Sequence, residues 1–215
     1  MGQGSSIRQR GWAAVLIVLA VLVVDQVIKI WVKTHLCLGE TAIEWEAYGI
    51  VWFKMTFLEN NGAAGSLNLF GNKILLTLFR FAAIVAISYY MWLLTRKKEA
   101  VRWGYFICIA LVLAGAAGNL IDCMFYGLCF TDSPRFPQVV AEYVGFGGFG
   151  HYAGFLEGKV VDMFELPFTF VWNIADAAIT IGVILLLLFY RKELSELSFS
   201  TSKKSETPEE IAHEA

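Results

Sequence analysis

Apolar runs long enough to cross a bilayer recur four times along the chain. They cover about residues 12–32, 74–94, 103–121 and 168–190. A helix needs about 20 predominantly apolar residues to cross the hydrocarbon core, and each run approaches or exceeds that length. Pro167 would open the fourth helix, because proline suits the first helical turn. The pattern predicts one all-α membrane domain of four transmembrane helices over residues 1–194.

Two long segments between the runs differ from ordinary loops. Residues 34–73 contain Ile50-Val51-Trp52-Phe53-Lys54-Met55-Thr56-Phe57, a β-branched and aromatic run typical of strands. Residues 123–160 contain glycines mixed with aromatic residues over 143–150, which suits the headgroup level of a bilayer. We expect a small β-rich element in the first segment and a mobile, surface-lying flap in the second. The polar residues 195–215 predict a disordered tail.

Composition supports the bilayer as the solvent of this chain. Hydrophobic residues make up 57% and the mean hydropathy is +0.59, whereas charged residues reach only 17%. Soluble domains carry about 25% charged residues. The basic residues sit in short clusters beside apolar runs and form no stripe, which argues against a nucleic-acid partner.

The basic clusters predict the orientation, because cytoplasmic flanks are enriched in Lys and Arg. Three clusters fall on one side if the chain crosses the membrane four times: Arg8 and Arg10; Arg96, Lys97, Lys98 and Arg102; Arg191 and Lys192. Both termini are then cytoplasmic, and residues 34–73 and 123–160 lie outside. No small-x-small cleavage pattern follows Val24, so the first run is interpreted as an uncleaved span.

The cysteines and histidines form no metal-binding pattern. They are Cys37, Cys108, Cys123, Cys129, His35, His151 and His213. A zinc site needs four ligands at tight spacing, and no CxxC pair is present. We interpret the cysteines as small apolar fillers, with a Cys123–Cys129 disulfide as an alternative. No metal or cofactor is expected.

Charged and amide residues interrupt the apolar runs near their predicted outer ends. A charge inside the bilayer costs a few kcal/mol or more, so such residues are candidates for function. The set comprises Asp25 and Lys29, Asn119 and Asp122, Asp162, and Asn173 and Asp176. Four carboxylates from separate segments at one membrane level predict a single site.

Structural interpretations of the same residues stay open. Asp25 and Lys29 could form only an i,i+4 ion pair, and Asn119 with Asp122 could only join helices. Asp176 lies inside the fourth run with no cation within a turn, so it needs a partner from elsewhere. Arg80 in the second run is a candidate partner, or its long side chain could extend outward to water.

Two carboxylates that lie close together at low dielectric cannot both ionise cheaply, so they share one proton. One then acts as a general base toward water and the other as a general acid, as in aspartic proteases. The sequence contains no GxSxG or HExxH motif that would indicate a rival hydrolase.

Five short polar elements occur in order along the chain. They are Asp25-Gln26-Val27-Ile28-Lys29 (DQxxK), Asn60-Asn61-Gly62-Ala63-Ala64 (NxGAA), Gly118-Asn119-Leu120-Ile121-Asp122 (GNxxD), Val160-Val161-Asp162 (VVD) and Asn173-Ile174-Ala175-Asp176-Ala177-Ala178-Ile179 (NxADxxI). These elements and their order resemble those of lipoprotein signal peptidases (signal peptidase II), and the resemblance covers the chain from about residue 12 to 190. The resemblance implies a catalytic dyad of Asp162 and Asp176. It implies supporting roles for Asp25, Lys29, Asn60, Gly62, Asn119, Asp122 and Asn173, although spacing alone could nominate Asp122 for the dyad.

The resemblance also implies a substrate and a location. The substrate would be a prolipoprotein with a diacylglyceryl group on its lipobox cysteine, cut just before that cysteine. The enzyme would lie among the lipids of the bacterial inner membrane with its site toward the periplasm, and globomycin would inhibit it. The β-rich element and the extended second loop would be periplasmic.

Three features depart from the family pattern. Cys123 stands where Arg commonly follows GNxxD, Gly65 stands where Phe commonly follows NxGAA, and residues 123–159 form an unusually long link.

Two other functions stay open. An ion- or proton-coupled transporter could use the same polar residues, but the chain shows no internal repeat and its charges gather on one side. A non-catalytic assembly factor could keep the site residues for packing.

Overall fold

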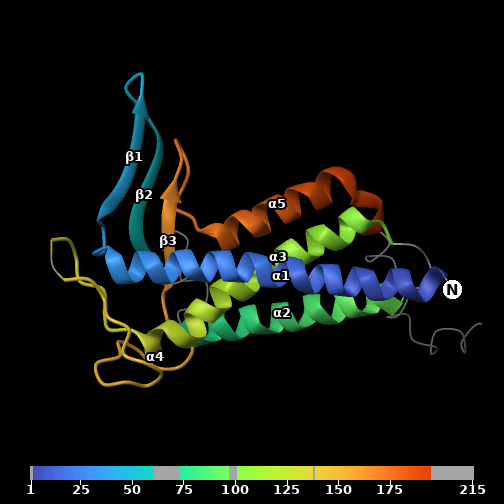
Figure 1. The fold of residues 1–215 in the computed structure, drawn as a ribbon, viewed down its shortest axis with the longest axis horizontal. Helices are drawn as coiled ribbons and strands as arrows, with labels where there is room; N and C mark the ends of the chain where they lie inside the picture. Colours follow the sequence, from blue (N-terminus) through green and yellow to red (C-terminus); the bar gives the residue numbers. More distant parts are fainter. Residues whose placement is uncertain (1, 61–72, 97–100, 138, 195–215) are drawn as a thin grey trace, which may run out of the picture.

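The computed structural model describes residues 2–60, 73–96, 101–137 and 139–194. Its long helices are α1 (Gly2–His35), α2 (Lys73–Arg96), α3 (Trp103–Ile121) and α5 (Ile174–Phe189). α3 continues through a π-helical turn (Asp122–Tyr126) into the short α4 (Gly127–Cys129). The long helices run side by side and form the bundle in Figure 1.

Three helices in the described part of the chain are long and apolar enough to cross a membrane. They are Gly11–His35, Lys73–Thr95 and Trp103–Cys129, and they make the chain a multi-pass membrane protein. These spans agree with the first three predicted runs. α5 is equally apolar but has only 16 residues, a length of about 24 Å at 1.5 Å per residue. The four-span topology therefore stays a proposal.

A three-stranded antiparallel sheet leaves the bundle where α1 ends (Figure 1). Its strands, in order across the sheet, are β1 (Thr41–Ala47), β2 (Ile50–Asn60) and β3 (Val160–Glu165). The first two confirm the β-rich element predicted in residues 34–73. β3 was not expected from the sequence. It follows the long connection in the chain and pairs with β2.

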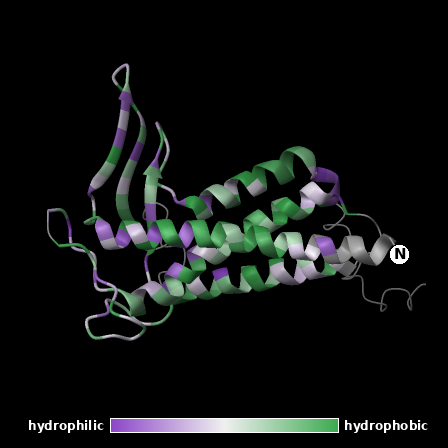
Figure 2. Ribbon diagram, in the orientation of Figure 1, coloured by the Kyte–Doolittle hydropathy of each residue, from purple (hydrophilic) through white to green (hydrophobic). Residues whose placement is uncertain are grey.

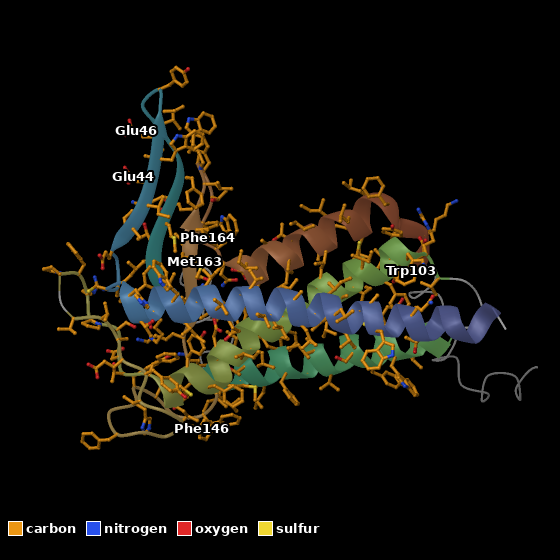
Figure 3. The ribbon with its side chains drawn as sticks, viewed as in Figure 1. Glu44, Glu46, Trp103, Phe146, Met163 and Phe164 are labelled. Atoms are coloured by element: carbon orange, nitrogen blue, oxygen red, sulfur yellow. The ribbon has the colours of Figure 1, made fainter. Side chains whose placement is uncertain are left out.

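The two faces of β1 differ in polarity. Ile43 and Trp45 alternate with Glu44 and Glu46, and the period of two places the pairs on opposite faces. In Figure 3 the two glutamates point away from the side on which the helices lie. Trp45 is 60% exposed. β1 thus presents an exposed apolar face and an acidic face.

The fourth helix begins later than predicted. Its expected start was Pro167–Phe168, whereas α5 begins at Ile174. The chain before it doubles back along β3, and the Trp172 N–H donates to the Phe164 carbonyl at 2.8 Å. Phe168 has a left-handed backbone with φ of 65°. This return turn uses the apolar residues that the sequence analysis assigned to the first turns of the helix.

α3 lies at the centre of the bundle and contacts α1, α2 and α5. Glycines permit close contact between α3 and α5: a Cβ on Gly115 would lie 2.2 Å from the Ala175 carbonyl oxygen, and one on Gly182 would lie 2.9 Å from the Cys108 oxygen. Small residues allow membrane helices to approach closely. The packing holds the start of α5 against the end of α3 that carries Asn119.

Hydrophilic residues gather in the part of α1 nearest the sheet, as Figure 2 shows, while most of the bundle is hydrophobic. That part of α1 includes Asp25, Lys29 and Lys33, whose exposed fractions are 1%, 0% and 0%. These charged side chains therefore point into the protein and not toward lipid.

The connection between α4 and β3, residues 130–159, folds back onto the bundle. The Gly158 N–H, for example, donates to the Cys123 carbonyl of the π-helical turn at 2.8 Å. Phe146 and Phe149 near the middle of the connection are 70% and 102% exposed, although the Phe146 ring also lies 6.2 Å from the ring of Phe125 in the π-helical turn. The mobile flap predicted here stays a prediction, but its base is fastened to the bundle.

Candidate active site

Asp162 lies on β3, where it is buried beside α5. It is 4% exposed, and β3 pairs it with Leu58 of β2. The Asn173 Nδ2 donates to its Oδ1 at 2.6 Å, and Asn60 at the end of β2 makes a second side-chain hydrogen bond. The strand that the sequence analysis missed therefore carries the predicted catalytic aspartate.

Asp176 lies in the first turn of α5. Asn173 is the N-cap residue of this helix, and its Oδ1 accepts from the Asp176 backbone N–H at 2.9 Å. The Asn119 Nδ2 donates to the Asp176 Oδ1 at 2.7 Å. The expectation that Asp176 sits deep inside a helix is wrong, because α5 begins only two residues before it. Its partner from another helix is Asn119, not Arg80.

One asparagine joins the two aspartates. Asn173 contacts Asp162 through its amide nitrogen and the Asp176 backbone through its amide oxygen, and it is completely buried. Burial first, and then the negative charge of Asp176, raise the pKa of Asp162 from its ordinary 3.8 to about 7. The hydrogen bonds from Asn173 and Asn60 act in the opposite direction but do not cancel the rise. Asp162 therefore holds a proton for much of the time at neutral pH.

Lys29 is the centre of a buried cluster of charged side chains, and Asn119 connects this cluster to Asp176. Its Nζ lies 2.9 Å from Asp25 Oδ2 and 2.8 Å from Asp122 Oδ2, and it donates to Asn119 Oδ1 at 2.9 Å. The side chains of Lys29, Asp25 and Asp122 are at most 1% exposed. The interpretation of Asp25 and Lys29 as only a local ion pair is wrong, because the same ammonium also binds two residues of the α3 segment.

The carboxylates of this cluster hold the backbone that carries Asp162 and Asp176. Asp25 Oδ1 accepts from the Ala175 N–H at 2.9 Å, which satisfies a free donor in the first turn of α5. Asp122 Oδ2 accepts from the Val161 N–H at 3.3 Å, directly before Asp162. Asp25 and Asp122 thus fix the positions of α5 and β3.

Gln26 and Tyr126 were not nominated from the sequence, although Gln26 lies inside the quoted DQxxK element. The Gln26 Nε2 donates to Asp122 Oδ1 at 2.8 Å and to Asp25 Oδ2 at 3.1 Å. Its Oε1 accepts from the Tyr126 hydroxyl at 3.1 Å. The Lys29 ammonium group and the Gln26 side-chain amide therefore each bind both buried carboxylates, those of Asp25 and Asp122. A Cβ on Gly118 would lie 2.7 Å from Asp25 Oδ2, so only glycine fits there.

The structure also places the cysteines and Arg80, whereas Gly62 lies outside the described residues. The Cys123–Cys129 disulfide is wrong, because both thiols are free. Six residues of helical rise separate them by about 9 Å, which is too far for a disulfide. The Arg80 Nη1 donates to the Cys123 Sγ at 3.0 Å, so Arg80 points inward to α3. No group of three or more His, Cys, Asp or Glu side chains within the described ranges could hold a metal ion.

The family model described as signal peptidase (SPase) II matches residues 17–191. The chain belongs to the signal peptidase II family. The lipoprotein signal peptidase of Porphyromonas gingivalis is 39% identical over 204 residues, which cover 86% of this chain and 84% of the relative. That of Amoebophilus asiaticus is 30% identical over 210 residues, covering 86% and 80%.

A solved structure of a membrane enzyme resembles this chain in fold. A bacterial membrane enzyme determined by the in meso method at 2.3 Å resolution superposes with a TM-score of 0.54 and 26% identity, covering 91% of this chain and 93% of that one. Membership of the signal peptidase II family makes the chain a protease and supports the removal of signal peptides from prolipoproteins. It gives no support to the transporter alternative.

Proposed function

We propose that this protein is an aspartic endopeptidase that removes the signal peptide from diacylglyceryl-modified prolipoproteins, with Asp162 and Asp176 as its catalytic dyad. One observation carries the assignment: Asn173 joins the two aspartates, and the charge of Asp176 helps to raise the pKa of Asp162 to about 7. Such a pair supplies an acid and a base at neutral pH without a metal or a nucleophilic side chain.

The environments of the two aspartates suggest separate roles. Asp162, with a pKa of about 7, holds a proton for much of the time at neutral pH and is the proposed general acid. Asp176 lies in the first turn of α5, where the helix dipole favours a negative charge, and it is the proposed general base. Asn119 and Asn173 orient the pair.

In the proposed reaction, Asp176 takes a proton from a water molecule as its oxygen attacks the scissile carbonyl carbon. Asp162 donates its proton to the carbonyl oxygen. The C–N bond then breaks, the leaving nitrogen takes the proton from Asp176, and the new carboxyl group returns a proton to Asp162. Both aspartates recover their starting states, and one water molecule is consumed.

The sheet supports a site at the membrane surface. β1 exposes Trp45 on one face and Glu44 with Glu46 on the other, and the sheet runs across the direction of the helices at the level of the site (Figure 3). Aromatic residues favour the headgroup level of a bilayer. A diacylglyceryl group would hold the substrate cysteine at the same depth. The proposed topology has four spans, with α5 as the fourth, both termini in the cytoplasm and the site on the periplasmic side of the inner membrane.

The substrate class is tested with the purified protein in detergent. A prolipoprotein that carries the diacylglyceryl group should be cleaved before its lipobox cysteine, and the same polypeptide without the lipid should be cleaved far more slowly. Globomycin should inhibit the first reaction. Equal cleavage of both forms would contradict the proposed substrate, and no cleavage of either would favour the assembly-factor alternative.

A further inference from the structure

A second buried polar cluster lies one helical turn beyond Lys29. It consists of Lys33 on α1, Glu59 on β2 and Ser133 on the connection, and we call it the Lys33 cluster. The Lys33 Nζ lies 2.5 Å from Glu59 Oε1 and 2.7 Å from Ser133 Oγ. The Ser133 hydroxyl donates to the same glutamate oxygen at 2.7 Å. The side chains of Lys33 and Glu59 are 0% and 2% exposed.

Aromatic rings surround the ammonium group of Lys33. Its Nζ lies 5.9, 5.6 and 4.9 Å from the ring centroids of Phe57, Phe130 and Tyr152. The faces of aromatic rings attract a desolvated cation. Two of these rings belong to the connection, so the Lys33 cluster fastens the connection to α1 and β2.

Glu59 is held ionised inside this cluster. Burial raises the pKa of Glu59, but the positive charge of Lys33 and hydrogen bonds from Lys33, Ser133 and Lys159 outweigh burial and keep it below its ordinary value. The Lys159 Nζ lies 2.9 Å from Glu59 Oε2. A lysine ammonium group therefore lies within ion-pair distance of each carboxylate oxygen of Glu59.

The Lys33 cluster lies directly beside the strand pairing that carries Asp162. In the register of β2 and β3, Glu59 pairs with Val161 and Asn60 pairs with Val160. Asn60, the neighbour of Glu59, makes a side-chain hydrogen bond to Asp162. Lys159, which also binds Glu59, immediately precedes β3. The cluster thus holds both strands at the point where they position the aspartate.

We infer that Lys33, Glu59 and Ser133 are positioning residues for the dyad: they fix the end of β2 so that Asn60 holds Asp162, and they make the connection of residues 130–159 a working part of the active site. This inference rests on the proposed function. It assigns the connection a role in positioning Asp162 in addition to that of the predicted surface-lying flap.

The inference predicts a change in the pH dependence of cleavage. The hydrogen bond from Asn60 lowers the pKa of Asp162, so loosening Asn60 should raise that pKa further. The other charged groups that act on Asp162, Asp176 on α5 and Lys29 on α1, are unchanged. Since Asp162 must be protonated to act as the acid, the basic limb of the kcat profile should move to higher pH.

The main variant combines Lys33→Met with Glu59→Gln, because removing both charges avoids leaving one of them buried alone. Ser133→Ala is the milder variant that keeps the ion pair. Asp132→Asn is the matched control, because Asp132 is 73% exposed and among the described residues pairs only with Lys159, so that this variant leaves the contacts among Lys33, Glu59 and Ser133 and the ion pair between Lys159 and Glu59 in place.

In the double variant, kcat should fall about tenfold with little change in KM, and the basic limb should move up by about 0.5–1 pH unit. Ser133→Ala should show a smaller change in the same direction, and Asp132→Asn should behave like wild type. Adding Asn60→Ala to the double variant should cause little further change, because both act through the same hydrogen bond.

Three results would overturn the inference. The first is a wild-type pH profile of kcat in the folded double variant, and the second is an effect of the double variant that adds fully to the effect of Asn60→Ala. If the double variant does not fold, a wild-type pH profile of kcat in Ser133→Ala is the third. Infrared titration of the Asp162 carboxyl in the same variants gives a readout that does not depend on cleavage. If Asp162→Asn kept full activity, the proposed dyad would fail, whereas the infrared titration would still report whether the cluster acts on Asp162.

Discussion

Replacing Asp162 with asparagine should change how the stability of the protein depends on pH. Burial and the charge of Asp176 raise the pKa of Asp162 from 3.8 to about 7, so between these values the folded protein binds a proton that the unfolded chain has released. The free energy of unfolding of the wild type therefore falls as pH rises through this window. Each tenfold change in proton affinity is worth about 1.4 kcal/mol, so the whole window amounts to about 4 kcal/mol.

Asparagine does not titrate, so the free energy of unfolding of the Asp162→Asn variant does not fall in this way as pH rises. The free energy of unfolding of the variant, relative to wild type, should rise by about 4 kcal/mol between about pH 4 and about pH 8. Reversible unfolding of the purified protein in mixed detergent micelles at both pH values measures the difference. In the exposed control Asp132→Asn the relative value should change by less than about 1 kcal/mol. Parallel pH curves for wild type and Asp162→Asn would refute the reasoning.

Three more predictions address the charge cluster, the topology and the connection. Lys29→Met leaves two buried carboxylates without their cation and should lower the free energy of unfolding by about 3–5 kcal/mol; a loss below about 1 kcal/mol in the same unfolding assay would contradict the assigned charge balance. Reporter tags at residue 100 and at both termini should report the cytoplasm and tags at 45 and 145 the periplasm, and a cytoplasmic signal at 145 would break the four-span topology. Phe146→Ser combined with Phe149→Ser should raise KM for the lipidated substrate with little change in stability, because both rings are exposed; unchanged kinetics would exclude a flap that contacts substrate.

The sequence predicted the helical framework because membrane spans leave a strong local signal. The runs at 74–94 and 103–121 closely match α2 and α3. The start of α5 was misplaced because residues 166–172 are as apolar as the helix itself. Their hydrogen bonds to β3 are set by the long-range pairing of the chain, which hydropathy does not report.

Most residues of the candidate site could be predicted from motifs, but the hydrogen bonds and ion pairs that join them could not. The structure brings Asp25, Lys29, Asn119, Asp122 and the two proposed catalytic aspartates into one buried network. β3 was missed because its six residues, Val160–Glu165, do not alternate between polar and apolar side chains, and because its partner strand β2 lies far earlier in the sequence.

Almost nothing in the sequence indicates the Lys33 cluster. Its members come from α1, β2 and the long connection, and Ser133 lies 100 residues from the lysine that it binds. Lys33 looks like an ordinary basic residue at the end of a span. Only the packing of Phe57, Phe130 and Tyr152 around it shows that its ammonium group is buried.

The central claim, that Asp162 and Asp176 form the dyad, is tested most directly by the cleavage rate of a diacylglyceryl-modified prolipoprotein by four variants. Asp162→Asn and Asp176→Asn should each lose about 10²–10⁴-fold or more in rate, and the double variant should be little worse than either, because the two act as a unit. Asp122→Asn should be damaged through geometry and keep residual activity. Near-normal cleavage by Asp162→Asn or Asp176→Asn, together with an inactive Asp122→Asn, would contradict the account and move the dyad to Asp122.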